Sequence, residues 1–162
     1  MDPVGRTARV VIASTRAAGG VYEDRTGPLI HAWLTDRGFE TPAPIVVADG
    51  QPVGDELRRA VADGVAVVLT SGGTGISPTD ATPEQTAQVL DREIPGLADA
   101  IRRAGLPKVP TSVLSRGMCG VAGRTLIVNL PGSVGGVRDG LGVLAEVLDH
   151  ALDQLAGKDH AG

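Results

Sequence analysis

The chain has 162 residues, a formal net charge of −4 and a single cysteine, Cys119. This length fits one domain, which we expect to span residues 1–162 with an ordered core from about 8 to about 156. The acidic balance without a basic patch excludes a nucleic-acid partner, the lone cysteine excludes an internal disulfide, and no apolar run is long enough to span a membrane, so we expect a cytoplasmic protein.

The first half of the chain alternates short apolar runs with helical patterns. Each apolar run is followed by a segment whose hydrophobic residues recur at helical spacing, and Asp24 or Thr26 is a candidate N-cap for the first helix. This alternation predicts a βαβαβ arrangement, which is a parallel sheet with right-handed crossover connections. We expect strands at 9–14, 45–48 and 65–69, helices at 24–38 and 53–63, and a turn at 49–52.

The second half is predicted to add helices and a pair of strands. Thr82, Pro83 and Gln85 fit a helix start, with the threonine as N-cap, the proline at the first helical position and the glutamine completing a capping box. The last helix is expected to start after Ser133 and to be amphipathic. We also expect a helix at 97–104 and strands at 111–118 and 125–130, joined by a turn that contains Gly120 and Gly123.

Small polar residues follow the strands of the predicted sheet. Ser14 ends the first strand, Asp49 follows the second, and the residues from Thr70 to Gly75 follow the third. Because ligands of parallel sheets bind beyond the carboxyl ends of the strands, we expect these residues to lie along one edge. The sequence therefore predicts one crevice, and we count Ser14 among its phosphate-binding residues.

The loop after the third strand has the composition of an anion site. Its hydroxyl groups, backbone N–H groups and missing Cβ atoms suit a phosphate. It lacks the lysine of a Walker A motif and the spacing of the dinucleotide fingerprint, and a tight turn without a ligand is the alternative. The turn at 129–133 (NLPGS) is a second junction between a strand and a helix. The loop consists of Thr70, Ser71, Gly72, Gly73, Thr74 and Gly75.

Two carboxylates are candidates for a magnesium site. Asp49 and Asp80 both belong to the predicted crevice, and paired carboxylates beside a polyphosphate commonly hold Mg²⁺. The alternative for Asp49 is a turn residue that bonds its own backbone. Asp80 is not needed as a helix cap because Thr82 is available, and Asp24 is interpreted as a cap.

The remaining reactive side chains do not form a catalytic set. The three histidines show no metal-ligand spacing. Cys119 is placed in a predicted turn without a histidine partner, so we do not expect it to be a nucleophile. Arg116 could contact an anion or lie in solvent, and we favour solvent.

Several motifs, in this order, resemble those of one protein family. They are GVYEDRTGP (20–28), VVADG (46–50), TSGGTGISPTDATPE (70–84), IPGLADAIR (94–102), VPTSVLSRG (109–117) and NLPGS (129–133). Together they resemble the MogA/MoaB family of molybdenum-cofactor biosynthesis proteins, which is similar in turn to the gephyrin G domain. The resemblance covers nearly the whole chain.

The resemblance implies a three-layer α/β/α fold, a homotrimer, and adenylylation of molybdopterin by ATP and Mg²⁺ with release of pyrophosphate. The terminal phosphate of molybdopterin would attack the α-phosphate of ATP, so no protein nucleophile is required. By position, Asp49 and Asp80 match essential carboxylates that serve Mg²⁺ and phosphate positioning. The residues from Thr70 to Gly75 match the phosphate-binding loop, Ser115 matches a serine near the pterin pocket, and Pro131, Gly132 and Ser133 match the turn at the nucleotide site.

One departure from the family pattern leaves a second function open. Some relatives carry an arginine shortly before the second aspartate, where this chain has Ser77, Pro78 and Thr79, and this version resembles the MoaB side of the family. The alternative is a non-catalytic trimer that binds molybdopterin and holds it, or passes it to a downstream molybdenum-insertion protein.

Overall fold

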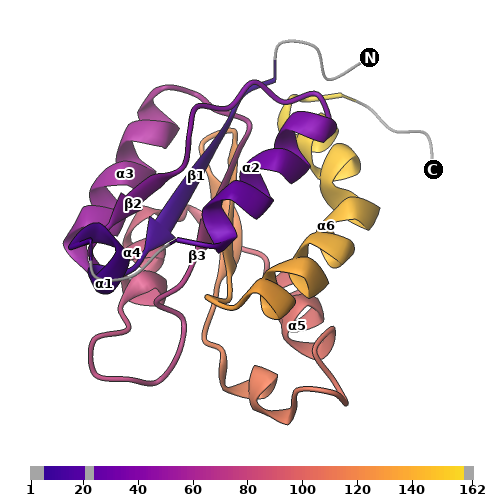
Figure 1. The fold of residues 1–162 in the computed structure, drawn as a ribbon. Helices are drawn as coiled ribbons and strands as arrows, with labels where there is room; N and C mark the ends of the chain where they lie inside the picture. Colours follow the sequence, from indigo (N-terminus) through magenta and orange to yellow (C-terminus); the bar gives the residue numbers. More distant parts are fainter. Residues whose placement is uncertain (1–5, 21–23, 159–162) are drawn as a thin grey trace.

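A six-stranded sheet forms the middle of the molecule in a computed structural model, which describes residues 6–20 and 24–158 (Figure 1). The strand order is β2-β1-β3-β6-β5-β4; the first three neighbouring pairs are parallel and the last two antiparallel. The predicted α/β class with a mostly parallel sheet is therefore confirmed. The strands are β1 (Ala8–Ala13), β2 (Ile45–Val47), β3 (Val67–Ser71), β4 (Arg92–Glu93), β5 (Cys119–Ala122) and β6 (Thr125–Leu130).

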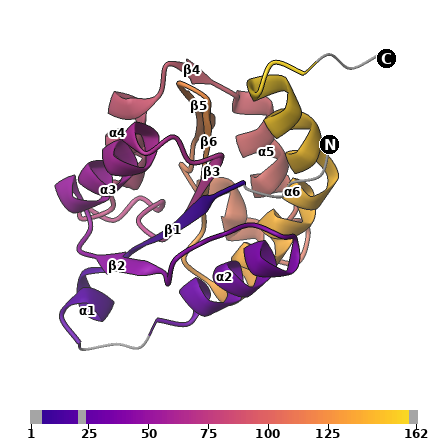
Figure 2. The ribbon, with the colours of Figure 1, turned by 90° about the horizontal axis from the view of Figure 1, so that it is seen from above.

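Helices cover both faces of this sheet and produce three layers. Figure 2 shows α3 and α4 on one side of the strands and α2, α5 and α6 on the other. The helices are α1 (Thr15–Ala18), α2 (Thr26–Asp36), α3 (Gln51–Ala62), α4 (Thr82–Val89), α5 (Pro95–Arg103), the short 3₁₀ helix η1 (Pro110–Leu114) and α6 (Val134–Leu155). Among the described residues, no helix is both long and apolar enough to cross a membrane.

The two faces of the sheet bury separate hydrophobic clusters. Successive strand side chains point to opposite faces, so Val10 and Ile12 of β1 pack in the cluster with α2 and α6, whereas Val11 packs in the cluster with α3. Aliphatic side chains fill both clusters, as the low aromatic content requires. This alternation along β1 holds the helices on both sides of one sheet.

Several element boundaries in the first half differ from the prediction by one or two residues, and the ends of β3 and α3 near the glycine loop matter most. β3 continues through Thr70 and Ser71, which were expected in the loop, because β1 pairs with them on one side and β6 on the other. α3 begins at Gln51 rather than at residue 53, since Pro52 fits the first helical turn, where its missing N–H costs nothing. The expected 49–52 turn is therefore shorter.

The predicted strand at 111–118 is wrong. η1 occupies the first half of this segment, and the strand that pairs with β6 is β5, so Cys119 and Gly120 lie in a strand. Only Gly123, with φ of +60°, remains in the hairpin turn. Strand β4 was not predicted, and α5 starts at Pro95, two residues early. Residues 21–23 of the first motif and His160 lie outside the described residues.

We expect Leu144→Ala to lower the free energy of unfolding by about 2 to 5 kcal/mol, because Leu144 of α6 is fully buried in the larger cluster and its truncation leaves a cavity. Val147 on the same helix is 40% exposed, so Val147→Ala should change the value by less than about 0.5 kcal/mol. Chemical denaturation of both variants measures the difference. Equal effects would contradict the assignment of the buried face of α6.

Candidate functional site

The chain segments that leave three neighbouring parallel strands meet at one edge of the sheet. Ser14 follows β1, Gly72 follows β3 and Pro131 follows β6. Because these strands are parallel and adjacent, their carboxyl ends lie side by side, which is where open α/β sheets bind ligands. The expected gathering of Ser14 and the glycine loop is present in the structure.

Close backbone contacts at this edge explain the glycines. A Cβ on Gly72, whose φ is +95°, would collide with the carbonyl oxygen of Ala13. A Cβ on Gly132 would lie 3.3 Å from the Cα of Gly72, so the two turns already touch. The N–H of Gly72 donates to Leu130 O at 3.2 Å. The two turns are thus packed backbone against backbone, with no room for side chains.

The hydroxyl groups of Thr70 and Ser71 are directed into the protein. Thr70 Oγ1 accepts a hydrogen bond from Asn129 Nδ2 at 3.0 Å, and Ser71 Oγ donates to Pro131 O at 2.7 Å. Ser71 Oγ also lies 3.0 Å from Thr26 Oγ1 at the start of α2. Both residues are buried. Their side chains therefore hold β3 against β6 and α2, and of the two only Ser71 also lines the smaller cavity described below.

Two cavities flank the contact between Gly72 and Gly132. The smaller one, of about 440 Å³, lies between the ends of β1 and β3 and the starts of α2 and α6. The larger one, of about 890 Å³, lies between the glycine loop, α5, the segment 104–115 and the start of α6. Both are lined by Gly72, Gly132 and Ser133. The site therefore consists of two neighbouring cavities that have the backbone around Gly72 and Gly132 in common.

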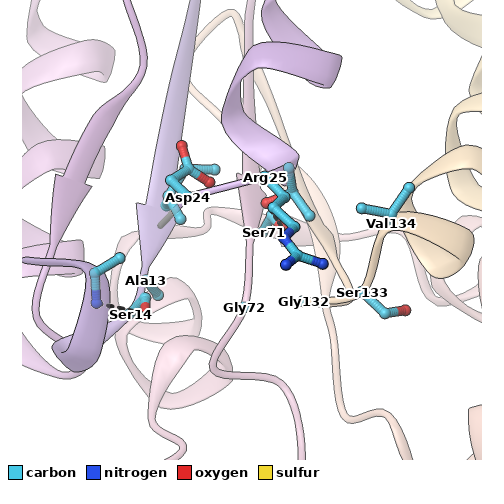
Figure 3. A pocket seen from close by; sticks show the side chains of 12 residues that line it. Ala13, Ser14, Asp24, Arg25, Ser71, Gly72, Gly132, Ser133 and Val134 are labelled. Carbon is cyan, nitrogen blue, oxygen red and sulfur yellow. Dashed lines mark hydrogen bonds between the residues drawn. The ribbon is translucent and has the colours of Figure 1, made fainter. Parts of the chain in front are cut away.

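The smaller cavity is lined by hydroxyls, backbone N–H groups and one arginine. Ser14 Oγ accepts from the N–H of Ala17 and Ser133 Oγ accepts from the N–H of Gly136, each at 3.1 Å, so the expected cap of α6 is confirmed. Figure 3 shows the guanidinium of Arg25 directed toward Gly72 and Gly132. Arg25 favours an anionic ligand in this cavity, whereas Asp24, whose carboxylate accepts from the N–H of Gly27, also lines it. The sequence analysis missed Arg25.

The larger cavity combines charged and apolar walls. Gly73, Thr74, Gly75, Asp80, Ser115 and Pro131 line it, together with the cations Arg102, Lys108 and Arg138. Arg102 Nη1 donates to Ser115 O at 3.3 Å and Gly117 O at 3.0 Å, which fixes the segment that carries Ser115. Ile76 and Leu114 on the same wall are 68% and 50% exposed. Such a wall suits a ligand with both a flat ring and negative charge.

Asp49 lies against Gly73 and lines neither cavity. Its Oδ1 accepts from the N–H of Gly50 at 3.0 Å and of Ala81 at 3.1 Å. A Cβ on Gly73 would come within 2.8 Å and 2.9 Å of the two carboxylate oxygens. Burial raises the pKa of Asp49, and the nearby charge of Asp80 adds to this, although the two backbone hydrogen bonds act in the opposite direction.

The predicted capping box at the start of α4 is wrong. The N-cap is Ala81, no side chain caps the helix, and Thr82 Oγ1 is buried without a hydrogen-bond partner. Asp49, which is distant in the sequence, accepts instead from the N–H of the N-cap residue, Ala81. Asp80 Oδ2 accepts from the N–H of Ser77 at 3.0 Å within its own loop. The N-cap of α2 is Arg25 rather than Asp24 or Thr26, and Asp24, one residue before it, accepts from the N–H of Gly27 at 3.0 Å.

Two other sequence interpretations have clear structural outcomes. Arg116 does not point into solvent: its guanidinium bonds the carbonyls of Gly75 and Asp80 and the carboxylate of Glu84, so the favoured interpretation is wrong. The hydrogen bond from Arg116 lowers the pKa of Glu84. Cys119 is buried, and burial raises the pKa of its thiol to about 12, which agrees with the expectation that it is no nucleophile.

The described part of the chain contains no cluster of three or more His, Cys, Asp or Glu side chains that could hold a metal ion by themselves. Asp49 and Asp80 remain as the candidate pair: the first carboxylate lies beside Gly73 and the second beside Gly75, so both flank the same loop. A site with one or two carboxylates and otherwise ligand or water oxygens is the type that Mg²⁺ uses beside phosphates, whereas Zn²⁺ takes a full protein ligand set.

Comparisons with known proteins find one family. The family model described as "Probable molybdopterin binding domain" matches residues 9–150. The chain is 37% identical to the "Molybdopterin adenylyltransferase" of Haemophilus influenzae over 137 residues, which are 82% of this chain and 69% of the relative. It is 38% identical to the "Molybdenum cofactor biosynthesis bifunctional protein" of Synechococcus elongatus over 96% of this chain, and it spans 49% of that longer protein.

The fold comparison agrees with the sequence comparison. The solved structure of the molybdopterin biosynthesis Mog protein from Mycobacterium ulcerans superposes with a TM-score of 0.91 at 70% sequence identity. The superposition covers 93% of this chain and 99% of that one. An identity this high means that the arrangement of strands and helices around the two cavities is shared.

We expect Gly73→Ala to be more destabilising than Gly64→Ala. Both glycines have positive φ, +68° and +71°, so both alanines cost about 1 to 2 kcal/mol in backbone strain. Only at Gly73 would the Cβ also collide with Thr82 Oγ1 and crowd Asp49, which should add about 1 to 3 kcal/mol. Chemical denaturation compares the variants, and equal losses would show that α4 and Asp49 yield without cost.

Proposed function

The chain belongs to the family of probable molybdopterin-binding domains, and from this premise we propose that it is a molybdopterin adenylyltransferase of molybdenum cofactor biosynthesis. The chain covers 69% of the Haemophilus relative of this name, whereas it covers only about half of the bifunctional relatives. The proposed activity is therefore that of a single domain. Its reaction joins two phosphate-bearing substrates, ATP and molybdopterin.

The observation that carries the proposal is the pair of cavities on either side of Gly72 and Gly132. A transfer between two substrates needs two binding pockets whose reacting ends meet, and the two cavities here share Gly72, Gly132 and Ser133 in their linings. We place the pterin in the larger cavity, whose apolar wall and Ser115 suit a flat ring. The nucleotide phosphates lie along the turn of Gly132 and Ser133, within reach of Arg25 in the smaller cavity.

The chemistry requires positioning and charge neutralisation rather than a protein nucleophile. The terminal phosphate oxygen of molybdopterin attacks the α-phosphorus of ATP, a new P–O bond forms, and the bond to the β-phosphate breaks to release pyrophosphate. The backbone N–H of Ser133 and the guanidinium of Arg25 would hold the phosphate oxygens. The buried, protonated thiol of Cys119 is consistent with a reaction that uses no covalent enzyme intermediate.

The residues beside the glycine loop fit Mg²⁺, as an all-oxygen donor set of few protein ligands. Asp80 lines the larger cavity, and Asp49 reaches the same loop from behind Gly73, where the buried Thr82 Oγ1 lacks a partner. When bound, Mg²⁺ would neutralise charge on the phosphates between which the bond breaks. Asp49 also holds the N–H of Ala81, so its second task is to fix the start of α4.

We propose further that the protein is a homotrimer in the cytoplasm, where ATP and Mg²⁺ are available, and that its product passes to a molybdenum-insertion protein. Light scattering should give three times the 16.5 kDa of one chain. A mass of one chain at micromolar concentration would contradict the trimer. This outcome would leave the two cavities, which lie within one chain, as the site of the reaction.

Asp80→Asn and Asp49→Asn should each lower the rate of adenylylated molybdopterin formation by about 10²-fold or more, because an amide cannot supply the negative charge that Mg²⁺ requires. The amide introduced by Asp49→Asn keeps an oxygen that can accept from Gly50 and Ala81, so this variant should fold. The measurement is product formation and pyrophosphate release with purified protein, ATP, Mg²⁺ and molybdopterin. Asp36→Asn, at an exposed position of α2, is the control.

Two outcomes of this assay would change the proposal. If Asp49→Asn alone retained full activity, Asp49 would serve only as a hydrogen-bond acceptor for α4. If the wild type bound molybdopterin but released no pyrophosphate and showed no ATP binding by titration calorimetry, the non-catalytic binding protein would be the better interpretation. Adenylylation by the wild type, lost in both aspartate variants, supports the transferase.

A further inference from the structure

The guanidinium of Arg116 joins both ends of the loop that carries Asp80. Nε donates to Gly75 O at 2.8 Å, Nη2 donates to Asp80 O at 3.0 Å, and the backbone N–H of Arg116 donates to Thr74 O at 2.7 Å. Gly75 and Asp80 are the first and last residues of this loop. The side chain of Arg116 therefore connects the two ends of this loop through hydrogen bonds.

Glu84 of α4 orients this arginine. Its Oε2 accepts from Nη1 of Arg116 at 2.6 Å and its Oε1 lies 3.3 Å from Nη2, a two-point contact that fixes the plane of the guanidinium. The contact links the start of α4 to the segment that leads into β5. With the guanidinium plane fixed, its Nε and Nη2 donors point at the two loop carbonyls rather than at solvent.

The loop itself has few other anchors. Ile76, Ser77, Pro78 and Thr79 are all exposed, and Ile76 is 68% exposed. Within the loop, the N–H of Asp80 donates to Ser77 O and the N–H of Ser77 donates to Asp80 Oδ2, each at 3.0 Å. These local bonds fix the Asp80 carboxylate relative to the loop, but they do not fix the loop relative to the sheet.

We propose that Arg116 is a positioning residue for the adenylyl transfer: by holding Gly75 O and Asp80 O, it fixes the Asp80 carboxylate at the wall of the larger cavity, and Glu84 orients it for this task. This inference rests on the proposed function. Arg116 lines neither cavity, and four of its contacts are already to protein oxygens, three of them carbonyls and one carboxylate. It therefore acts through Asp80 and not by touching substrate.

The chemistry of the contacts requires arginine. Three acceptors lie around one planar group, and the guanidinium presents its N–H donors in a fixed fork that matches them. A lysine ammonium at the end of a flexible stem keeps the positive charge but cannot reach Gly75 O, Asp80 O and Glu84 together. Charge alone should therefore not replace Arg116.

The test compares Arg116→Met, Arg116→Lys and Glu84→Gln with the wild type and with Arg59→Met, which removes an exposed arginine that pairs with Glu56 of the same helix. Steady-state adenylylation at varied ATP, molybdopterin and Mg²⁺ gives kcat and KM for each. Hydrogen–deuterium exchange of the peptide that spans residues 75–80 gives a readout that does not depend on activity. Circular dichroism and thermal melting show that each variant is folded.

For Arg116→Met we expect kcat to fall by about 10²-fold, the cost of a reacting group displaced by about 1 Å, with KM for ATP changed little, a higher Mg²⁺ requirement and faster exchange in the 75–80 peptide. Arg116→Lys should not restore kcat, and Glu84→Gln should show a smaller loss in the same direction. Arg59→Met should match the wild type in every measurement.

Three kinetic results would overturn the inference. They are an unchanged kcat in Arg116→Met, recovery of kcat by Arg116→Lys, and a raised KM for ATP or molybdopterin at constant kcat, which would mean direct contact with substrate. Unchanged exchange in the 75–80 peptide would also overturn it. If the wild type itself forms no adenylylated product, the proposed function fails, whereas the exchange experiment still decides whether Arg116 holds the loop.

Discussion

The contact between Gly72 and Gly132 is the constraint on which the site depends. β3 and β6 are neighbouring parallel strands, so the turns that follow them leave the sheet side by side. With side chains at these positions the turns would have to separate, because a Cβ on Gly72 meets the carbonyl of Ala13 on the other neighbouring strand. The absence of side chains lets a ligand in either cavity approach the backbone of these two turns closely.

Buried polar groups hold these two turns in place. Asn129 in β6 donates to Thr70 Oγ1 at 3.0 Å and Thr86 Oγ1 at 3.1 Å, and its Oδ1 accepts from the N–H of Met118. An unpaired amide in the core would cost about 1 to 3 kcal/mol, so the satisfied network specifies one register between β3, β6 and α4. The hydroxyl groups of Thr70 and Ser71, which the sequence suggests as phosphate ligands, thus form hydrogen bonds within the protein.

The net charge of the chain does not describe the charge at its cavities. The chain is acidic overall, and its arginines and lysines are scattered along the sequence. Folding nevertheless brings Arg25 to one cavity and Arg102, Lys108 and Arg138 to the other. The net charge therefore argues against a long polyanion such as nucleic acid but not against sites for small anions, because a few cations at a concave surface suffice to bind phosphate. Arg116, by contrast, is a cation that lines neither cavity, because its guanidinium is bonded to loop carbonyls and a carboxylate of the protein.

The sequence by itself determined the α/β class, most of the helices and strands, the edge at which Ser14 and the glycine loop gather, and the family, because apolar periodicity and the glycine motif are local properties of the chain. Only the tertiary structure decided where β3 ends, that 111–118 is no strand, that Asp49 rather than Thr82 binds the backbone at the start of α4, and that Arg116 holds the loop of Asp80. Each of these depends on a partner that lies far away in the chain. Local patterns describe what a segment can form, whereas hydrogen bonds between distant segments select among those possibilities.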